Sequence, residues 1–567
     1  MKTSKYIVIA LLTGILTVGQ SCSLKEELKD VPTPASIKTE QDLTAVEEGI
    51  YARLNNRNGF KFLGMLILFL NADDIYSTSG SEFGPYADRS YTGNNTAEFF
   101  NMMYYVISDA NSLIALLDRS GLDPTVKSRG YGEAYFLRAF AYYYLVRLFG
   151  GVPLRTGATS ISSDFYLPRS SADSVYRQIF TDFKNASALL PPAAGIPGGE
   201  LGRASKGAAQ ALLAEACLTY GDHLSLQGKD GTAYFQNAAL YADSVLNSGQ
   251  YHLLPDFADV FDVKQEAAAY KEVIFGVRFQ TDPTQSGQPA AGSEFALRCN
   301  APNQWNTSGN NPNGQGDGSF RAMPWFADYY RTGDYGDTDI VTGEATFDYR
   351  NQVSLSMGGY KNGQFCVTYP NIPAPDESTI ALALCGKYVD PNGKDGRNNG
   401  NDFYIIRLSE VYLIKAEAEN ELHGPTQEAL DAFNAVRARI RKADGTSRAL
   451  PADITLDEGL TKEQFRMKIF DERGIELFGE GQRWFDLVRM RSPVSATQTM
   501  YEYQFLHVLP AYTTELPKYK AATHSWSTHF AVFKPALNVS VPKFLLFPIP
   551  TNELQKNPDF GEQNPGW

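Results

Sequence analysis

Apolar residues recur at a spacing of three and four positions in three separate parts of the chain. The three stripes are Met103, Ile107, Ala110 and Ile114; Tyr234, Ala238, Tyr241 and Val245; and Ala429, Phe433, Val436 and Ile440. This spacing places each set on one face of an α-helix. A helix with one apolar stripe must bury it against another element. The chain is therefore predicted to be mostly α-helical.

Further helical stretches are expected to pair with the helices that carry these stripes. The expected partners are residues 205–220, before the second stripe, and residues 403–422, before the third across His423-Gly424-Pro425. Another pair is expected at 128–149 and 172–190, because Gly-Gly-Val-Pro and Pro-Pro follow these two stretches and end helices. Helix pairs that bury their stripes by stacking are typical of tetratricopeptide-like repeats. The pattern predicts such a helix-pair scaffold.

The scaffold is interrupted by a long insert. Helix pairs occupy about 98–250 and 403–490, whereas residues 251–402 are rich in Gly, Asn, Pro and aromatic residues and poor in helical periodicity. Irregular segments on a rigid scaffold are the usual place for recognition. We expect one globular body at 37–567, with the ligand-binding surface on the irregular, loop-rich insert.

The N-terminal region resembles a lipoprotein export signal. Lys2 and Lys5 precede an apolar run at 6–18, which is too short to span a bilayer as a helix. The run ends in VGQSC at 18–22, which resembles a bacterial lipobox. This predicts a signal peptide at 1–21, lipidation of Cys22 and a flexible tether at 22–36, so that lipid chains anchor the body without spanning the membrane. Ordinary secretion with an incidental cysteine is the alternative.

Charge and cysteine content narrow the possible partners. The net charge of −13 disfavours nucleic acid and anionic lipid headgroups, because both repel an acidic surface. Besides Cys22 the chain has four cysteines without CxxC spacing, so neither a zinc site nor a disulfide framework is indicated. A single bridge between Cys366 and Cys385 is a possibility.

Several segments together resemble the SusD/RagB family of lipoproteins. They are the lipobox, YFLRAFAY at 135–142 running to FGGVP at 149–153, RLSEVYLIKAEA at 407–418, ERGIELFGEGQRWFDL at 472–487, and the ending from FPIP at 547–550 to NPGW at 564–567. The likeness covers nearly the whole chain after the signal peptide. It implies a lipoprotein of the cell outer membrane, exposed on the surface, that binds oligosaccharides, or peptides in some members. It also implies delivery to a SusC-like TonB-dependent transporter, with no catalysis and no cofactor.

Two loop-rich segments have the composition of a saccharide site, which needs aromatic faces beside groups that form directed hydrogen bonds. The first, residues 71–95, contains the candidates Asp73, Asp74, Tyr76, Tyr86, Arg89 and Asn94. The second, residues 300–320, contains Trp305, Asn303 and Asn306 in a Gly-rich setting. Trp305 is the stronger candidate, because the sequence around it shows no apolar periodicity and a role in the core is therefore less natural there.

Other conspicuous groups are interpreted as structural. Glu472 and Glu476 would repel on one helix face unless Arg473, Arg483 or Arg489 neutralises them, so we predict an ion-pair network rather than an active site. Thr461 and Gln464 form a capping box at the start of that helix, and Trp325 and Trp484 are expected to pack internally. The stretch from Asp390 lacks the EF-hand spacing, and no histidine spacing indicates a metal.

Two alternatives to nutrient capture remain open. One is a surface adhesin or assembly scaffold that uses the helical repeats for protein contact. The other is a glycoside hydrolase, which would need two carboxyl groups roughly 5–10 Å apart across a cleft.

Overall fold

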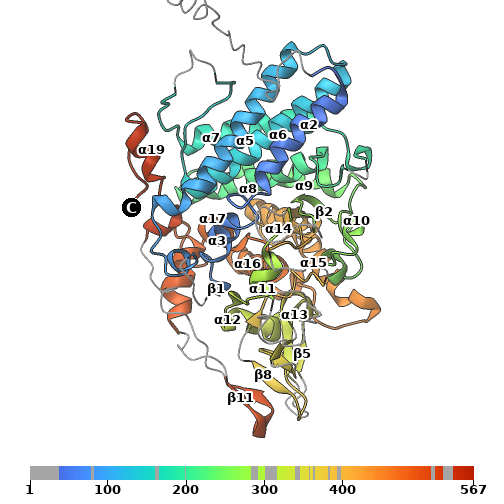
Figure 1. Cartoon of the computed structure of the whole chain (residues 1–567). Coiled ribbons are helices and arrows are strands. Elements are labelled where there is room, and N and C mark those ends of the chain that lie inside the picture. Colours follow the sequence, from blue (N-terminus) through green and yellow to red (C-terminus); the bar gives the residue numbers. More distant parts are fainter. Residues whose placement is uncertain are drawn as a thin grey trace, which may run out of the picture.

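The protein is mostly helical, with small sheets confined to the irregular segments (Figure 1). The computed structural model describes residues 37–77, 82–159, 165–197, 200–281, 291–300, 316–338, 345–356, 358–361, 364–380, 383–391, 397–511, 518–527 and 541–567. Within these ranges, no helix combines the length and the apolar character needed to cross a membrane.

Five long helices form the first part of the scaffold. They are α5 (Gly93–Arg119), α6 (Pro124–Phe149), α7 (Ala172–Leu189), α8 (Lys206–Leu226) and α9 (Thr232–Leu246). Each packs on the next in chain order, and together with α2 (Glu40–Leu54) they occupy one end of the molecule (Figure 1). Local signals fix their ends: Asp123 caps α6 before Pro124, and Gly150, at φ 74°, ends it.

The second part of the scaffold continues directly from the first. It consists of α14 (Leu408–His423), α15 (Gln427–Arg441) and α16 (Lys462–Glu476). Helix α14 packs on α15 and α16 and also on α9 (Figure 1). The two groups are therefore neighbours in space although more than 150 residues lie between α9 and α14.

The predicted stripes face the core. Met103, Ile107, Ala110, Ala238 and all four residues of the third stripe are at most 1% exposed, and Ile114, Tyr234 and Tyr241 pack at the edge of the core. The expected capping box is also present: the Thr461 side chain accepts from the Gln464 amide, and the Gln464 side chain accepts from the Thr461 amide. These predictions are confirmed.

The prediction that residues 403–407 belong to a helix is wrong. Residues Phe403–Arg407 form strand β10, which pairs antiparallel with β2 (Val273–Val277) across the start of the insert. Every residue of both strands is buried. A strand buried on both faces shows a continuous apolar run without alternation, which short sequence windows do not separate from a buried helix.

The irregular segments contain the remaining elements. Before the scaffold lie α3 (Leu63–Phe69), β1 (Ile75–Ser77) and α4 (Gly84–Ala87). The insert adds α10 (Glu266–Ala269), α11 (Phe295–Cys299), β3 (Phe320–Ala322), α12 (Pro324–Ala327), β4 (Gly336–Thr338), β5 (Ala345–Phe347), α13 (Arg350–Ser354), β6 (Gly358–Lys361), β7 (Gln364–Thr368), β8 (Ser378–Ile380) and β9 (Ala383–Leu384). The C-terminal part adds α17 (Arg483–Arg489), α18 (Met500–Tyr503), β11 (Tyr519–Lys520), β12 (Ser525–Trp526) and α19 (Thr551–Lys556).

The possible bridge between Cys366 and Cys385 is not formed. Both cysteines are free and buried, as are Cys217 and Cys299. Cys366 lies on β7 opposite Gly359 of β6. The backbone of Cys385 instead pairs antiparallel with that of Leu355, and its side chain contacts the Cys299 side chain. Their different neighbours keep the two thiols in separate parts of the core.

Candidate ligand-binding site

The two segments with saccharide-site composition meet at one small sheet. Strand β1, within the first segment, pairs antiparallel with β3, which ends the second, and Ser77 lies opposite Phe320. In an antiparallel pair the end of one strand lies beside the start of the other. The chain therefore leaves β1 and enters β3 at the same edge of the sheet, which brings together segments more than 200 residues apart.

Helix α11 forms a packed base for the second segment. The Phe295 ring stacks between Tyr388 and Phe403, at centroid distances of 4.9 and 5.4 Å. After residues 301–315, Asp317 returns to the same helix: its amide donates to the Leu297 carbonyl at 2.6 Å, and its carboxylate accepts from Arg298 at 2.6 Å. Both ends of this stretch are thus fixed on α11.

Charged side chains surround this edge of the sheet. Arg57 pairs with Glu82 at 2.9 Å, and its guanidinium lies 4.1 Å from the Phe62 ring centroid. The Arg57, Glu82 and Asp317 side chains are 37%, 51% and 36% exposed. Guanidinium and carboxylate groups of this kind can form directed, charge-assisted hydrogen bonds with hydroxyl groups of a ligand.

Sequence reasoning did not single out Arg57, Glu82 or Asp317. A signal was available for Arg57, which lies in the polar run Asn55–Gly59 directly after α2, and polar runs of this kind mark loops. Glu82 and Asp317 carry no such pattern, because their places at the sheet edge depend on the pairing of β1 with β3.

Three of the predicted ligand residues, Trp305, Asn303 and Asn306, lie outside the described residues, as does Cys22. Their roles stay predictions. In the other segment Asn94 is exposed in the first turn of α5.

Asp73 and Asp74 are buried beneath the site. The Asp73 carboxylate accepts from Arg483 of α17 at 2.7 and 3.1 Å, and its carbonyl accepts from the Trp325 indole at 2.9 Å. Burial, together with the charge of Asp73, raises the pKa of Asp74 to about 7. The structure gives Asp73 an internal partner, so it supports the site from below.

Tyr76, Tyr86 and Arg89 are also buried, with 8%, 3% and 2% of their surface exposed. The Tyr86 hydroxyl donates to the Asn95 carbonyl at 2.6 Å. Arg89 donates to the Asn71 carbonyl at 3.2 Å, and its guanidinium lies 4.2 Å from the Phe505 ring centroid. These side chains hold the first segment in place, and of the six candidates there only Asn94 reaches the surface.

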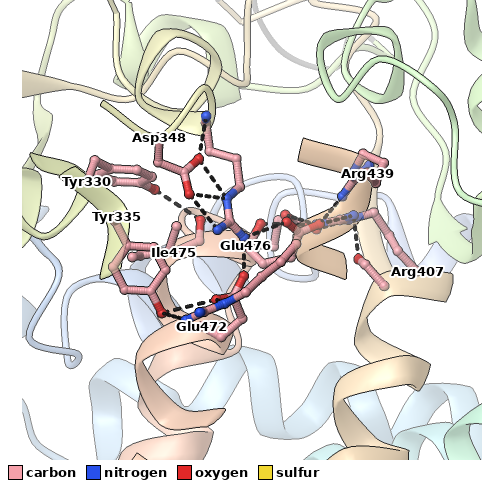
Figure 2. A network of polar contacts seen from close by, with 12 residues as sticks. Tyr330, Tyr335, Asp348, Arg407, Arg439, Glu472, Ile475 and Glu476 are labelled. Carbon is pink, nitrogen blue, oxygen red and sulfur yellow. Dashed lines mark hydrogen bonds and ion pairs between the residues drawn. The ribbon is translucent and has the colours of Figure 1, made fainter. Parts of the chain in front are cut away.

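Glu472 and Glu476 of α16 belong to a buried network of charges (Figure 2). The Arg350 side chain of the insert lies 2.6 Å from Glu472 and 3.0 Å from Glu476, and pairs with Asp348 at 2.7 Å. On the other side Arg407 and Arg439 contact Glu476. The network therefore joins the insert to β10, α15 and α16.

The buried charges of this network balance. Its acidic members are Glu272, Asp348, Glu472, Glu476 and Glu480, and its basic members are Arg350, Lys387, Arg407, Arg437 and Arg439. Burial alone would raise the pKa of Glu476, but Arg439, Arg407 and Arg350 outweigh it and hold that pKa well below its ordinary value. Arginine neighbours likewise lower the pKa of Glu472. The predicted structural ion-pair network is confirmed, but the arginines expected in it are wrong. Arg473, Arg483 and Arg489 pair instead with Glu410, Asp73 and Glu417, respectively.

The expected packing roles of the two tryptophans are confirmed as well, since Trp325 and Trp484 are each 1% exposed.

Among the described residues, no group of three or more His, Cys, Asp or Glu side chains could hold a metal ion. Asp390 instead accepts from the Gly400 amide at 2.7 Å and the Thr281 hydroxyl at 3.2 Å.

Comparison with known proteins gives one consistent family. The model of the SusD family matches residues 271–567, and a second family model, described as starch-binding and associating with the outer membrane, matches residues 26–218. SusD-like protein P2 of Formosa agariphila is 31% identical over 512 residues, which cover 87% of this chain and 91% of that protein.

Solved structures share the fold. A SusD homolog from Bacteroides thetaiotaomicron matches with a TM-score of 0.74 at 22% identity, over 94% of this chain and 98% of its own. A laminarin binding SusD-like protein matches with a TM-score of 0.63 at 22% identity, over 94% of this chain and all of its own. By its sequence and by its helix-pair scaffold with a loop-rich insert, this chain belongs to the SusD family.

Proposed function

We propose that this protein binds oligosaccharides, without turning them over, at the edge of the β1–β3 sheet. The observation that carries the proposal is the meeting of residues 71–95 and 300–320 at that edge, with exposed Arg57, Glu82 and Asp317 around it. Family membership and the laminarin binding of a structural relative support a saccharide ligand. Trp305 would supply the stacking face, and Asn303, Asn306 and Asn94 the amide hydrogen bonds.

The proposal includes a location. Lipidated Cys22 would anchor the chain in the outer membrane, with the tether at 22–36 holding the body at the cell surface. The description of the second matching family as associating with the outer membrane supports this placement. Replacement of Cys22 by Ser would release the protein or leave it unprocessed. Membrane association of a processed Cys22→Ser chain, with no transporter present, would contradict the anchor.

The proposal also includes a partner. A binding protein on the outer surface supplies the cell only if its ligand passes inward, so we infer delivery to a SusC-like TonB-dependent transporter through the helix-pair scaffold. Affinity purification from outer membranes in mild detergent should recover such a transporter in near-equal amounts. Recovery of this protein alone at low salt would contradict the partnership.

The binding experiment separates this function from its alternatives. The purified full chain is mixed with soluble glycans and with peptides, and bound and free ligand are then analysed for size. Retained, intact glycan supports the proposal, and retained peptide changes the ligand class. Shortened glycan would indicate a glycoside hydrolase. No retained ligand, together with adhesion of the protein to other cell-surface proteins, would favour an adhesin or assembly scaffold.

A further inference from the structure

A polar cavity lies away from the β1–β3 edge, where the C-terminal hairpin meets the insert. The hairpin consists of β11 and β12, and the insert contributes the sheet β6-β7-β8 (Figure 1). The cavity between them has a volume of about 730 Å³. This volume falls within the range of roughly 300–1,000 Å³ that is typical of small-molecule sites.

The hairpin is fixed on the insert by Trp526. Its indole donates to the Asn371 carbonyl at 2.8 Å, and its ring packs edge-on against Tyr369 at a centroid distance of 5.3 Å. Across the hairpin, Trp526 pairs with Tyr519, and their rings lie 5.4 Å apart. Two segments some 150 residues apart in the sequence thus form the two walls of one cavity.

The lining chemistry selects a neutral ligand rich in hydroxyl groups. The insert supplies the Gln364 amide, the Glu377 carboxylate and the Ser378 and Thr379 hydroxyls, and the hairpin supplies the Tyr519 phenol and the His524 imidazole. No Lys or Arg is among the described residues that line the cavity, so an anionic ligand would find no counter-charge there.

The walls also contain an aromatic ring, that of Tyr519, and polar groups held by hydrogen bonds. The Tyr519 hydroxyl lies 3.2 Å from Nδ1 of His524, which positions the imidazole, and the Glu377 carboxylate accepts from the Ala374 amide at 2.8 Å. Glu377, Ser378 and His524 are exposed, so the cavity opens to solvent. Sugar rings pair one apolar face with many hydroxyls, which a tyrosine ring beside amide, hydroxyl and carboxylate groups complements.

We propose that this cavity is a second saccharide subsite, distinct from the β1–β3 edge, which holds another part of a long neutral glycan. The inference rests on the proposed function, because the same ligand would occupy both places. Attachment at two points raises the effective concentration of the second contact, so the cavity would favour long chains over short ones.

Fluorine NMR on the full chain in mild detergent, labelled with 5-fluorotryptophan, tests this inference. Four of the five tryptophans sample the relevant places. Trp305 reports on the loop segment, Trp526 on the cavity wall through its contact with Tyr519, and the buried Trp325 and Trp484 on the fold. Replacement of single tryptophans by Phe assigns the signals. The probes are laminarin, maltoheptaose and oligosaccharides of xyloglucan and mannan.

The expected result is that one of these glycans shifts the Trp526 signal and that Tyr519→Ala or His524→Ala abolishes this shift. These variants should weaken binding of a long chain about tenfold and that of a trisaccharide much less, as expected for the loss of one of two linked contacts. Lys520→Ala, on the same hairpin but outside the cavity lining, should change neither signal nor affinity. Unchanged Trp325 and Trp484 signals establish that the variants are folded.

The contradicting results are distinct. A glycan that shifts Trp305 or binds by calorimetry without moving Trp526 would overturn the second subsite and leave the proposed function intact. A Trp526 shift that survives both substitutions would also overturn it. Absence of binding by every glycan would contradict the proposed function and the subsite together.

Discussion

The scaffold and the insert are stabilised in different ways. The scaffold helices are 15 to 27 residues long and bury apolar stripes against neighbouring helices, most of which follow one another in the sequence. The insert has strands of two to five residues, and its Arg350 and Lys387 contact α16 or Glu480 directly after it through buried ion pairs. The difference indicates that apolar packing builds the support, whereas long-range charge pairing fixes the irregular part on it.

The largest expected effect comes from removing the central charge that joins the two regions. Arg350→Met keeps much of the side-chain volume but removes the buried partner of Asp348 and one of the arginines that neutralise Glu472 and Glu476. Loss of one member of a buried ion pair typically costs about 3–5 kcal/mol. Denaturant unfolding, followed by circular dichroism, should show a loss of this size.

The matched control for this prediction is Arg53→Met, which removes an arginine whose pair with Asp109 is largely exposed. It should cost much less, because exposed ion pairs contribute little. Glu472 and Glu476 have lowered pKa values, so their stabilisation is present above the ordinary value of 4.5 and is lost as the pH falls below it. Equal losses in the two variants would contradict the role of the network.

A smaller effect is expected at Asp74, beneath the binding edge. Its pKa is raised from 3.8 to about 7, so the folded protein holds this proton more strongly and loses stability as the pH rises from about 4 to 7. Asp74→Asn removes this loss. Between pH 5 and pH 8 the stability of the variant relative to the original chain should increase by about 2–3 kcal/mol.

Asp88→Asn, at an exposed position of the same segment, is the control for Asp74. Thermal unfolding across the pH range measures both. A stability difference at Asp74→Asn that stays constant with pH would show that burial does not penalise this carboxylate.

Trp305→Ala separates binding from stability. If Trp305 is the stacking face, its removal should cost about 2 kcal/mol or more of binding free energy, about thirtyfold in affinity, with an unchanged melting temperature. Trp325→Ala is the contrasting variant, because loss of its buried ring should cost about 3–5 kcal/mol of stability. Calorimetry and thermal melts decide the matter, and a large drop in melting temperature for Trp305→Ala would place that ring in the core.

The smallest expected effect lies in the scaffold itself. Thr461→Ala removes the side chain that caps α16 and should cost about 1 kcal/mol. Thr181→Ala, at an exposed position in the middle of α7, should be nearly neutral. If urea midpoints show the same loss for both, the cap has no specific role.

The long helices were predictable because each one repeats a local pattern. The stripe from Ala429 to Ile440 and the capping box at Thr461 need only neighbouring residues to be recognised. Strand β10 was misread because a strand buried on both faces lacks alternation. The small sheets of the insert were not predicted, since strands of two to five residues offer no period to detect.

The site was predictable in composition but not in geometry. Asp73 was expected at the surface, because charged residues are rarely buried unless they are paired. Its partner Arg483 lies 410 positions away in the sequence, and no local pattern connects the two. The meeting of the two segments at β1 and β3 likewise depends on a long-range strand pairing.

Hydrogen exchange on the full chain, with and without a glycan that it retains, tests the central claim most directly. The account predicts slower exchange in peptides from residues 71–95 and from the insert at 251–402, and unchanged exchange in the rest of α5 and in α6 to α9. Protection of those scaffold helices without any in the insert would contradict the account, as would a bound glycan that slows exchange nowhere in the chain.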